Sequence, residues 1–431
     1  MRLPAIAVAL SLTAAVYAAA PAPTFHKEVL PILQQRCVEC HRSGEAVPFT
    51  MSSYKETRPW AKSIKQAVVT KKMPPWFADP HYGKFSNDRT LTQSEIDTLV
   101  AWVDGGALEG NPKDAPAPRE FVEGWTIGKP DLVIQMPNAF QIPAQGVIEY
   151  QYVILPTNLK EDRWVVAAEV RPGDKSVMHH VITSIREPGS QWNADMEPGK
   201  IFVPAKGARA GQQLSGGLAG YVPGQALPSA ETPHRATLLK AGSDIVFQLH
   251  YTPNGKATTD RTKIGLIFAK EPPKYQVMGG NSAAYRFTIP PGDSAYEVVG
   301  TSTLSYDCDL ISMMPHAHLR GKSFEYRVTH PSGEVETVLS VPKYDFNWQL
   351  TYYLAKPMHL LKGTKIDVIA KFDNSAANPY NPDPAKEVHW GEQTFEEMMM
   401  GYFAVVVDAD KVPANSGKRG ATASSGSEPG H

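Results

Sequence analysis

Short runs of alternating apolar or β-branched residues recur between residues 122 and 412, and they constrain the fold more than any other feature. They are separated by turn-forming clusters and include DLVIQM, VIEYQYVIL, RWVVAAEV, HHVITSI, DIVFQLHY, KIGLIFA, FEYRVTH and KIDVIAKF. Successive side chains of a strand face opposite sides of a sheet, so such runs favour half-buried strands. The spacing predicts an all-β sandwich or jelly roll. The stretch is long for one sandwich, so we expect two in tandem, with a boundary within 269–276.

Composition places the chain among globular proteins. A length of 431 residues corresponds to about three domains. The 37 prolines and 33 glycines favour turns and short strands over long helices. Because the formal net charge is −1, the sequence gives no support for a nucleic-acid partner or an anionic membrane surface.

The first twenty residues, MRLPAIAVALSLTAAVYAAA, have the pattern of a secretion signal. Arg2 is their only charge, an apolar run follows, and small residues at 18–20 offer a cleavage site. A retained anchor helix is the alternative, although the run is alanine-rich and only marginally long enough to span a bilayer. We expect a secreted or periplasmic protein with no membrane span after cleavage. Three cysteines in the whole chain give no disulfide framework despite export.

The segment CVECH at 37–41 is a Cys-x-x-Cys-His motif, the attachment pattern of a c-type haem. Cys37 and Cys40 can form two thioethers to the porphyrin, and His41 can bind the iron. A redox dithiol and half of a zinc site are the alternatives. Neither requires the adjacent histidine, and no second cysteine pair is present to complete a zinc site. The motif predicts one covalently attached haem.

The second axial ligand of this haem must come from another segment. KKMPPWFADP presents Met73 beside two prolines, and a thioether opposite a histidine is typical of electron-carrying cytochromes. Met51 competes but lies close to the attachment point, and His81 is interpreted as a loop residue.

Helical apolar spacing precedes the motif in TFHKEVLPILQQRC and returns in LTQSEIDTLVAWVDGGA. Region 22–108 thus resembles the class I cytochrome c family over its whole length, which implies an all-α electron carrier.

Four short motifs in the β-rich region contain residues that bind metals. They are SVMHHVIT with His179 and His180, VFQLHYTPNG with His250, SMMPHAHLRG with His316 and His318, and TFEEMMMGYF with three thioethers. A lone strand histidine is usually a core or surface residue, but burying two adjacent imidazoles without partners is costly. On a bulged strand both could reach one metal ion, and His-x-His puts two imidazoles on one face. Imidazole with thioether suits copper, particularly the reduced ion, better than zinc or magnesium.

The order of these four motifs resembles the copper type II, ascorbate-dependent monooxygenases, which include the peptidylglycine α-hydroxylating and dopamine β-type enzymes. That family has two jelly-roll domains with one copper each, facing one another across a water-filled gap, and the resemblance covers 122–412. It implies an electron-transferring copper and an oxygen-activating copper. The implied ligands of the first copper are His179, His180 and His250, and those of the second are His316, His318 and Met398.

The remaining correspondences with this family are less regular. Met398 is preferred because it follows two glutamates, while a register slip to Met399 or Met400 stays open, and Tyr402 falls where the family has a tyrosine near the substrate. An arginine and an asparagine that hold the substrate carboxylate in the peptide-hydroxylating branch are replaced here by Met314 and Met400. This departure from the family argues against a peptidyl-glycine held in that way and suggests a more apolar substrate, with adaptable core filling as the alternative role of these methionines. The family's disulfides cannot form, because Cys308 is alone in this region.

These interpretations predict a multidomain chain, with an N-terminal all-α cytochrome c domain followed by two all-β jelly-roll or sandwich domains. The expected segments are a signal peptide at 1–20, the cytochrome at 22–108, a linker at 109–121, β-sandwiches at 122–272 and 273–412, and a disordered tail at 413–431.

The expected function is a dicopper monooxygenase that hydroxylates a C–H bond of a small organic substrate with O2. Electrons would enter from an ascorbate-like reductant or another redox protein, through the haem. A non-catalytic electron carrier or copper-handling protein on the same scaffold is the alternative.

Overall fold

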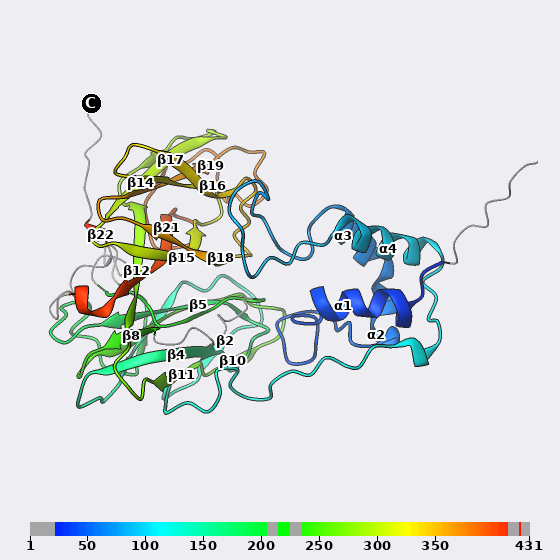
Figure 1. Ribbon diagram of the computed structural model, residues 1–431, viewed down its shortest axis with the longest axis horizontal. Coiled ribbons are helices and arrows are strands. Elements are labelled where there is room, and N and C mark those ends of the chain that lie inside the picture. Colours follow the sequence, from blue (N-terminus) through cyan, green and yellow to red (C-terminus); the bar gives the residue numbers. More distant parts are fainter. Residues whose placement is uncertain (1–21, 205–213, 225–234, 413–421, 424–431) are drawn as a thin grey trace, which may run out of the picture.

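The computed structural model describes residues 22–204, 214–224, 235–412 and 422–423. The expected signal segment at 1–20 lies outside the described residues, as does most of the expected tail. Figure 1 shows the helices gathered at one end of the molecule and two β-rich halves at the other. Strands account for 37% and helices for 12% of the residues that the structure describes. Within the described residues, no helix is both long and apolar enough to cross a membrane.

The expected fold class, with an all-α domain over 22–108, is wrong. The helical segments there are short and separated by long irregular stretches, and α4, the longest, has 12 residues. Helices of this length are marginal on their own and depend on packing against the rest of the protein. The helical segments of the N-terminal region are η1 (Phe25–Val29), α1 (Leu30–Arg36), α2 (Tyr54–Thr57), η2 (Arg58–Trp60), α3 (Ala61–Val69), α4 (Gln93–Asp104) and η3 (Pro112–Asp114).

Local sequence explains where α4 begins and ends. The Thr92 hydroxyl accepts from the backbone N–H of Glu95 at 3.2 Å, and the Glu95 carboxylate accepts from the N–H of Thr92 at 2.7 Å. This reciprocal cap satisfies two N–H groups that lack helical partners. Leu99 and Trp102 of α4 are buried in a small core with Phe25, and Gly105 follows the last turn.

The rest of the chain is built from strands. In the first half they are β1 (Leu132–Gln135), β2 (Phe140–Ile142), β3 (Gln151–Pro156), β4 (Arg163–Arg171), β5 (Met178–Arg186), β6 (Ile201–Phe202), β7 (Gly220–Tyr221), β8 (Arg235–Leu239), β9 (Asp244–Tyr251), β10 (Thr258–Asp260) and β11 (Lys263–Phe268). In the second half they are β12 (Tyr275–Ala284), β13 (Thr288–Ile289), β14 (Tyr296–Leu304), β15 (Cys308–His316), β16 (Gly321–Thr329), β17 (Val335–Val341), β18 (Tyr352–Leu360), β19 (Lys365–Phe372), β20 (Val388–His389), β21 (Met399–Asp408) and, after η4 (Ala409–Lys411), β22 (Thr422–Ala423).

The two β-rich halves share one sheet. Its order is β1-β11-β4-β8-β12-β21-β15-β18, and β8 pairs with β12 in parallel across the junction of the halves. A five-stranded sheet, β6-β3-β9-β5-β7, packs on the first half of it, and another, β17-β16-β19-β14-β22, packs on the second. Because the order of strands in a sheet depends on pairings between distant segments, alternation within single runs could not reveal the shared sheet.

Alternating side chains fill the space between these sheets. In β19, KIDVIAKF, Ile366, Val368, Ala370 and Phe372 are buried and their neighbours are more exposed. Separate clusters of buried apolar side chains lie in each half, one built from β1 to β11 and the other from β12 to β21. Such packing holds the strands of each half rigidly and fixes the positions of the side chains at their ends.

The N-terminal region docks onto both β-rich halves. Rings of Trp76 and Phe85 pack on Tyr352 of β18 with centroid distances of 4.9 and 5.5 Å. The Lys175 ammonium forms a partly buried ion pair with Glu45 at 2.8 Å. These contacts place the Cys-x-x-Cys-His segment against the edge of the β-rich part, as Figure 1 shows for the loops that extend from the helices.

Candidate metal centre

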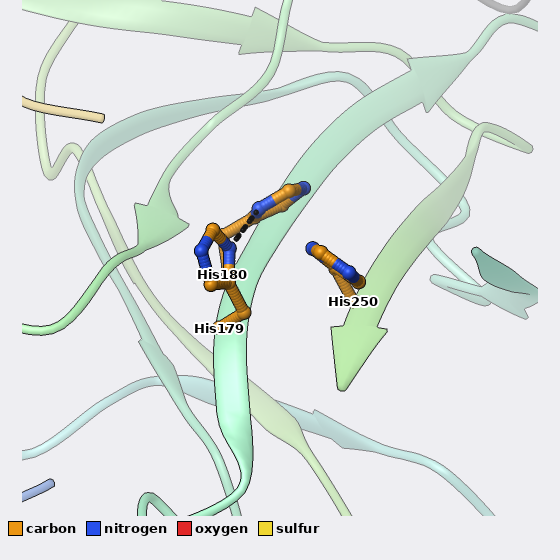
Figure 2. Close-up of side chains that lie close together, drawn as sticks. All are labelled: His179, His180 and His250. Carbon is orange, nitrogen blue, oxygen red and sulfur yellow. Dashed lines mark hydrogen bonds between the residues drawn. The ribbon is translucent and has the colours of Figure 1, made fainter. Parts of the chain in front are cut away.

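Three histidines from two neighbouring strands converge in the first half. His180 on β5 lies directly opposite His250 on β9, so both side chains project from one face. The β5–β9 register shifts between Met178 and His180. An extra residue at such a bulge re-aims a side chain, which lets His179 turn to the same side as His180. Figure 2 shows the three imidazoles, the histidine trio, facing one another.

The geometry of the histidine trio suits a shared metal ion. Ring centroids lie 5.3 Å apart for His179 and His180, 4.6 Å for His179 and His250, and 5.0 Å for His180 and His250. One ligand nitrogen from each residue lies within 4.8 Å of the others. Nε2 of His179, Nε2 of His180 and Nδ1 of His250 are buried without a hydrogen-bond partner. Buried polar atoms normally have partners, and a bound cation would supply one for all three nitrogens.

A second group, the histidine pair His316 and His318, lies where β15 ends. Nδ1 of His316 donates to Oε1 of Gln349 at 2.8 Å, and Nδ1 of His318 donates to the carbonyl of Glu396 at 3.2 Å. An amide or carbonyl oxygen only accepts, so Nδ1 bears the proton in both rings and Nε2 is left with a lone pair. Nε2 of His318 is buried without a partner. Both imidazoles are thus oriented as metal ligands usually are.

The trio and the pair are adjacent, which differs from the expected gap between two separate sites. The rings of His180 and His316 lie 6.4 Å apart. Tyr150 fills the space between the groups, with its ring 4.5 Å from that of His250 and 6.0 Å from that of His318. The end of β15 in the shared sheet lies beside β5 of the five-stranded sheet, so all five imidazoles form one largely buried cluster. The distance between the two groups of histidines could not be predicted from the sequence, because no local pattern encodes the distance between strands of different sheets.

The Glu397 side chain organises the segment that contains Met398. One of its oxygens accepts from the N–H groups of His318 at 2.9 Å and Met398 at 3.2 Å, and the other accepts from the N–H of Arg320 at 2.7 Å. Glu397 is fully buried, and this burial raises the pKa of its carboxyl to about 7 although the three N–H groups favour the charged form. The predicted ligands His318 and Met398 are therefore held by one carboxylate.

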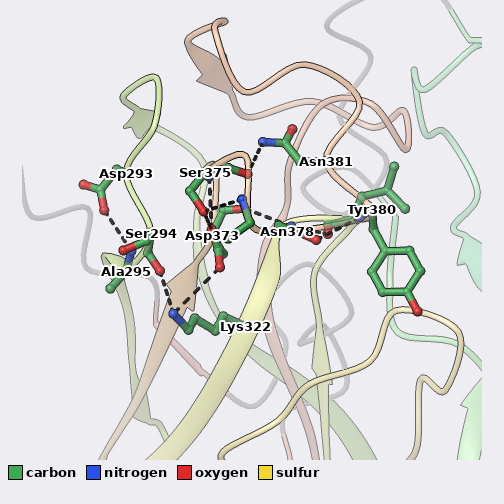
Figure 3. Close-up of polar contacts among 11 residues, drawn as sticks. Asp293, Ser294, Ala295, Lys322, Asp373, Ser375, Asn378, Tyr380 and Asn381 are labelled. Atoms are coloured by element: carbon green, nitrogen blue, oxygen red, sulfur yellow. Dashed lines mark hydrogen bonds and ion pairs between the residues drawn. The ribbon is translucent and has the colours of Figure 1, made fainter.

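Arg320 joins this arrangement to the turn-rich loop after β19. Its Nε donates to Oδ1 of Asn374 at 2.9 Å and its Nη1 to the carbonyl of Phe395 at 3.0 Å. Figure 3 shows how side-chain turns hold the loop itself, with Ser375 bonded to Asp373 and Asn378 bonded to the backbone of Asp373. The loop is rich in asparagine and proline because these residues form its turns. Through Arg320 the loop supports the site.

A cavity of about 890 Å³ opens beside the histidine cluster. His180, His316, Met398, Met400 and Tyr402 all contribute to its wall. Tyr402, on β21, has its ring 6.3 Å from that of His316. The cavity has the size of a small-molecule site, and its thioether and aromatic side chains suit apolar ligands.

Burial keeps the five imidazoles neutral. It lowers the pKa of His179 to about 4, that of His316 to about 4 and that of His318 to about 3. It also holds the pKa of His180 and of His250 well below the usual 6.5, with the neighbouring imidazoles adding to the effect. A histidine must be deprotonated to bind a metal ion, so the cluster is ready for one near neutral pH.

The stability of the metal-free protein is expected to fall as the pH drops from 6.5 toward 4. In this window the unfolded chain binds protons at these histidines and the folded chain does not, so each group contributes a slope of up to about 1.4 kcal/mol per pH unit. Thermal unfolding of the chelator-treated protein between pH 8 and pH 5 measures this effect. An unfolding midpoint that stays constant over this range would contradict the buried, neutral state of the cluster.

Gln349 is expected to affect metal binding without contacting the metal. Gln349→Leu removes the acceptor that orients His316, and the loss of such a partner typically lowers metal affinity by about 10- to 100-fold. A competition titration of cuprous ion against a chromogenic chelator measures the change. Gln349→Glu keeps an acceptor oxygen and serves as the control, so an equal loss in both variants would contradict an orienting role.

The Cys-x-x-Cys-His segment fits a haem. Cys40 and His41 each donate a backbone N–H to the carbonyl of Cys37, at 3.1 and 2.9 Å, so the motif forms a helical turn after α1. Residues three and four apart on such a turn share a face, which puts both thiols and the imidazole on one side. Nδ1 of His41 donates to the carbonyl of Phe49 at 3.1 Å, which leaves Nε2 with a lone pair for iron. Both thiols are free.

The second axial ligand stays a prediction. The backbone N–H of Met51 donates to the carbonyl of His41 at 2.9 Å, so Met51 is tied directly to the haem motif and is itself buried. The N–H of Met73 donates to the carbonyl of Ala67 at 3.2 Å beyond the end of α3, and Met73 is half-buried. His81 is exposed and bonds to Asp79 at 2.6 Å, as expected for a loop residue.

Several residues of the site were not singled out by sequence analysis. Phe346 stacks on His179 with a centroid distance of 4.8 Å and an interplanar angle of 21°. Gln349 and Arg320 orient the histidine pair and Glu397, as described above. These residues lie in loops with no apolar periodicity, so no pattern in the sequence indicated them.

Comparisons with known proteins identify no family for this chain. No family model matches the sequence, and no curated protein matches it. Among solved structures, one described as the structure of infectious bursal disease virus Gx strain matches with 8% sequence identity and a TM-score of 0.20. That match covers 65% of this chain and 71% of the viral one. Similarity at this level carries no argument about the fold, so the function of the chain must be inferred from its site.

Proposed function

We propose that the protein is an exported copper monooxygenase that hydroxylates a C–H bond of an apolar organic substrate with O2. In this reaction one oxygen atom enters the C–H bond and the other leaves as water, with two electrons and two protons supplied. The observation that carries the proposal is the cluster of five imidazoles, four of them buried and His179 partly so, with unpartnered ring nitrogens in both groups, beside a cavity large enough for a small molecule.

The donor set supports copper. The histidine trio would hold one ion through His179, His180 and His250, and the histidine pair would hold a second together with Met398. Neutral imidazoles with a thioether suit a redox-active soft ion better than zinc, magnesium or calcium. Bound there, copper would supply the one-electron chemistry with O2 that amino-acid side chains cannot perform.

The residues of the chain have distinct roles in this proposal. Gln349 and the Glu396 carbonyl fix the histidine pair so that Nε2 of each ring is available for the ion. Glu397 holds the backbone of His318 and Met398 together. Tyr150 occupies the space between the groups. Such fixed positions supply the orientation on which catalysis by a metal site depends.

The cavity indicates the chemical class of substrate. Met314, Met398, Met400, Tyr402 and Phe403 present thioether and aromatic surfaces to it. Such side chains bind apolar groups by contact near the histidine cluster. We therefore infer an apolar or aromatic substrate whose reacting carbon lies near the histidine pair.

A haem on Cys37 and Cys40 would supply electrons to this site. The motif has the turn, the tautomer and the free thiols that covalent haem needs. An ascorbate-like reductant or another redox protein would refill it. The alternative of a copper carrier or simple electron carrier is less well supported, because such a protein has no need of a cavity of about 890 Å³ next to its metal ligands.

Metal analysis combined with O2 uptake tests the proposal. The mature protein is expected to bind two copper ions and one haem, and to consume O2 with a reductant and small aromatic or alkyl probes. Met398→Ile is expected to keep the haem and the trio's copper and to lower coupled O2 uptake by about 100-fold or more. His179→Ala is expected to lose the trio's copper.

Met358→Ile is the matched control, because Met358 lies on β18 and does not line the cavity. It is expected to leave copper content and O2 uptake unchanged. A protein that binds copper and haem but consumes no O2 with any probe would support the carrier instead. A protein that binds no copper would end the proposal.

A further inference from the structure

The segment 344–350, YDFNWQL, lies between the haem motif and the histidine cluster, and we call it the bridging segment. It is firmly anchored near the histidine pair. The Tyr344 hydroxyl donates to the carbonyl of Ala317 at 2.8 Å and accepts from its N–H at 3.2 Å. Ala317 separates the two histidines of the pair, so the segment and the pair form one rigid unit.

At one end the bridging segment contacts the histidine trio. The Phe346 ring stacks on His179, with centroids 4.8 Å apart and planes at 21°. The same ring lies 6.0 Å from that of His250 and 6.3 Å from that of His318. Phe346 therefore stacks on one ring of the trio and lies beside the nearer ring of the histidine pair.

At its other end the bridging segment approaches the haem motif. A Cβ placed on Gly224 would lie 3.1 Å from Sγ of Cys40 and 3.8 Å from Cζ3 of Trp348. The Cys40 sulfur and the Trp348 indole thus lie on either side of a narrow gap at Gly224, which a larger residue would fill. Gly224 also has a φ of +75°, which other residues rarely adopt. Arg89 also contacts this sulfur, at 3.9 Å.

The distance between the two ends is fixed by docking contacts on either side. The ion pair of Lys175 with Glu45 and the packing of Trp76 and Phe85 on Tyr352 hold the N-terminal region in place. Phe346 and Trp348 are two residues apart, and the N–H of Trp348 donates to the carbonyl of Asp345 at 2.9 Å in a tight turn. A short, packed route therefore runs from the Cys40 sulfur to the His179 ring, with backbone bonds between Trp348 and Phe346 and through-space contacts at either end.

We propose that the bridging segment is the route by which single electrons pass from the haem to the histidine trio, with Trp348 and Phe346 as its positioning residues. The inference rests on the proposed function, since it assumes haem on Cys37 and Cys40 and copper on the trio. In each transfer a ferrous haem iron loses one electron and becomes ferric, and a cupric ion gains it and becomes cuprous. No bond forms or breaks and no proton moves.

Flash photoreduction of the haem in the full-length, haem- and copper-loaded protein without O2 tests this route. The decay of the reduced-haem absorbance and the loss of the cupric EPR signal report the transfer directly. Trp348→Leu is expected to slow this decay by roughly tenfold or more, since small changes in packed geometry have large effects on rate. Trp348→Phe keeps an aromatic ring and is expected to retain most of the rate, with unchanged haem and copper contents.

Trp125→Leu, a change in the first β-rich half away from the bridging segment, is the control and is expected to leave the rate unchanged. Should Trp348→Leu fail to fold, Phe346→Leu removes the other ring of the route and is expected to slow transfer similarly. A wild-type rate in both leucine variants that retain their cofactors would overturn the route while leaving the monooxygenase proposal intact. Absence of any transfer in the wild-type protein, with both cofactors bound, would instead refute the haem as electron donor.

Discussion

Replacing His180 with alanine is expected to abolish copper binding at the histidine trio and to lower O2-dependent hydroxylation by more than about 100-fold. The His180 side chain is fully buried, opposite His250 on the next strand. With alanine at position 180, only His179 and His250 would remain, and two imidazoles are too few to hold the copper ion of the trio. The copper bound per chain, measured by metal analysis, is expected to fall by half.

The same variant is expected to lose stabilisation by copper. A ligand that binds only the folded state at a thousand times its Kd adds about 4 kcal/mol of stability. The wild-type unfolding temperature should therefore rise on adding cuprous ion, and the rise should be smaller for His180→Ala. His359→Ala is the control, because His359 is an exposed histidine bonded to Asp309 at 2.9 Å. An equal copper-induced rise in wild type and His180→Ala would show that the trio is not the binding site.

Replacing Arg320 with leucine is expected to lower the free energy of unfolding by about 3–5 kcal/mol, the usual cost of removing one partner of a buried charged network. The side chain is 2% exposed. Its loss would remove one of the two donors to the Asn374 amide oxygen and the side-chain donor to the Phe395 carbonyl, and would leave the buried Glu397 carboxylate without a nearby cation. Urea unfolding followed by tryptophan fluorescence measures the change.

Arg327→Leu provides the comparison for this variant. Arg327 is an exposed arginine paired with Glu325 on the same strand, and such pairs contribute at most about 1 kcal/mol. The Arg320 variant should also lose copper at the histidine pair, because Glu397 positions His318 and Met398. If Arg320→Leu were no less stable than Arg327→Leu, the network would not support the site.

The position of the β-rich region and the identity of the candidate ligands could be predicted from local patterns. KIDVIAKF alternates because one face of β19 is buried, and any sheet that buries this face requires that alternation. The adjacent pair at 179–180 was conspicuous because two neighbouring imidazoles rarely lie in an apolar run. The bulge that turns His179 and His180 toward His250 depends on the pairing of β5 with β9. From the sequence, a bulge was only one possible way for the two imidazoles to reach one metal ion.

The failures have one physical origin. The all-α domain was predicted from helical spacing that in fact supports only short helices between irregular stretches, since their length depends on packing more than on pattern. The sheet that runs through both halves was not predicted, because the pairing of β8 with β12 that joins them is not a local feature. Phe346 stacks on His179, and Gln349 bonds to His316. Neither contact was predicted, because both residues lie in a loop whose sequence has no apolar periodicity.

By itself, then, the sequence determined which side chains are candidate ligands for metals and haem, and which runs are suited to strands, because both follow from residue chemistry and near-neighbour spacing. Only the tertiary structure decided that five imidazoles from two halves of the chain meet in one buried cluster beside a cavity. It also decided that a single loop joins this cluster to the haem motif. Those facts depend on contacts between residues far apart along the chain, and no local pattern specifies such contacts.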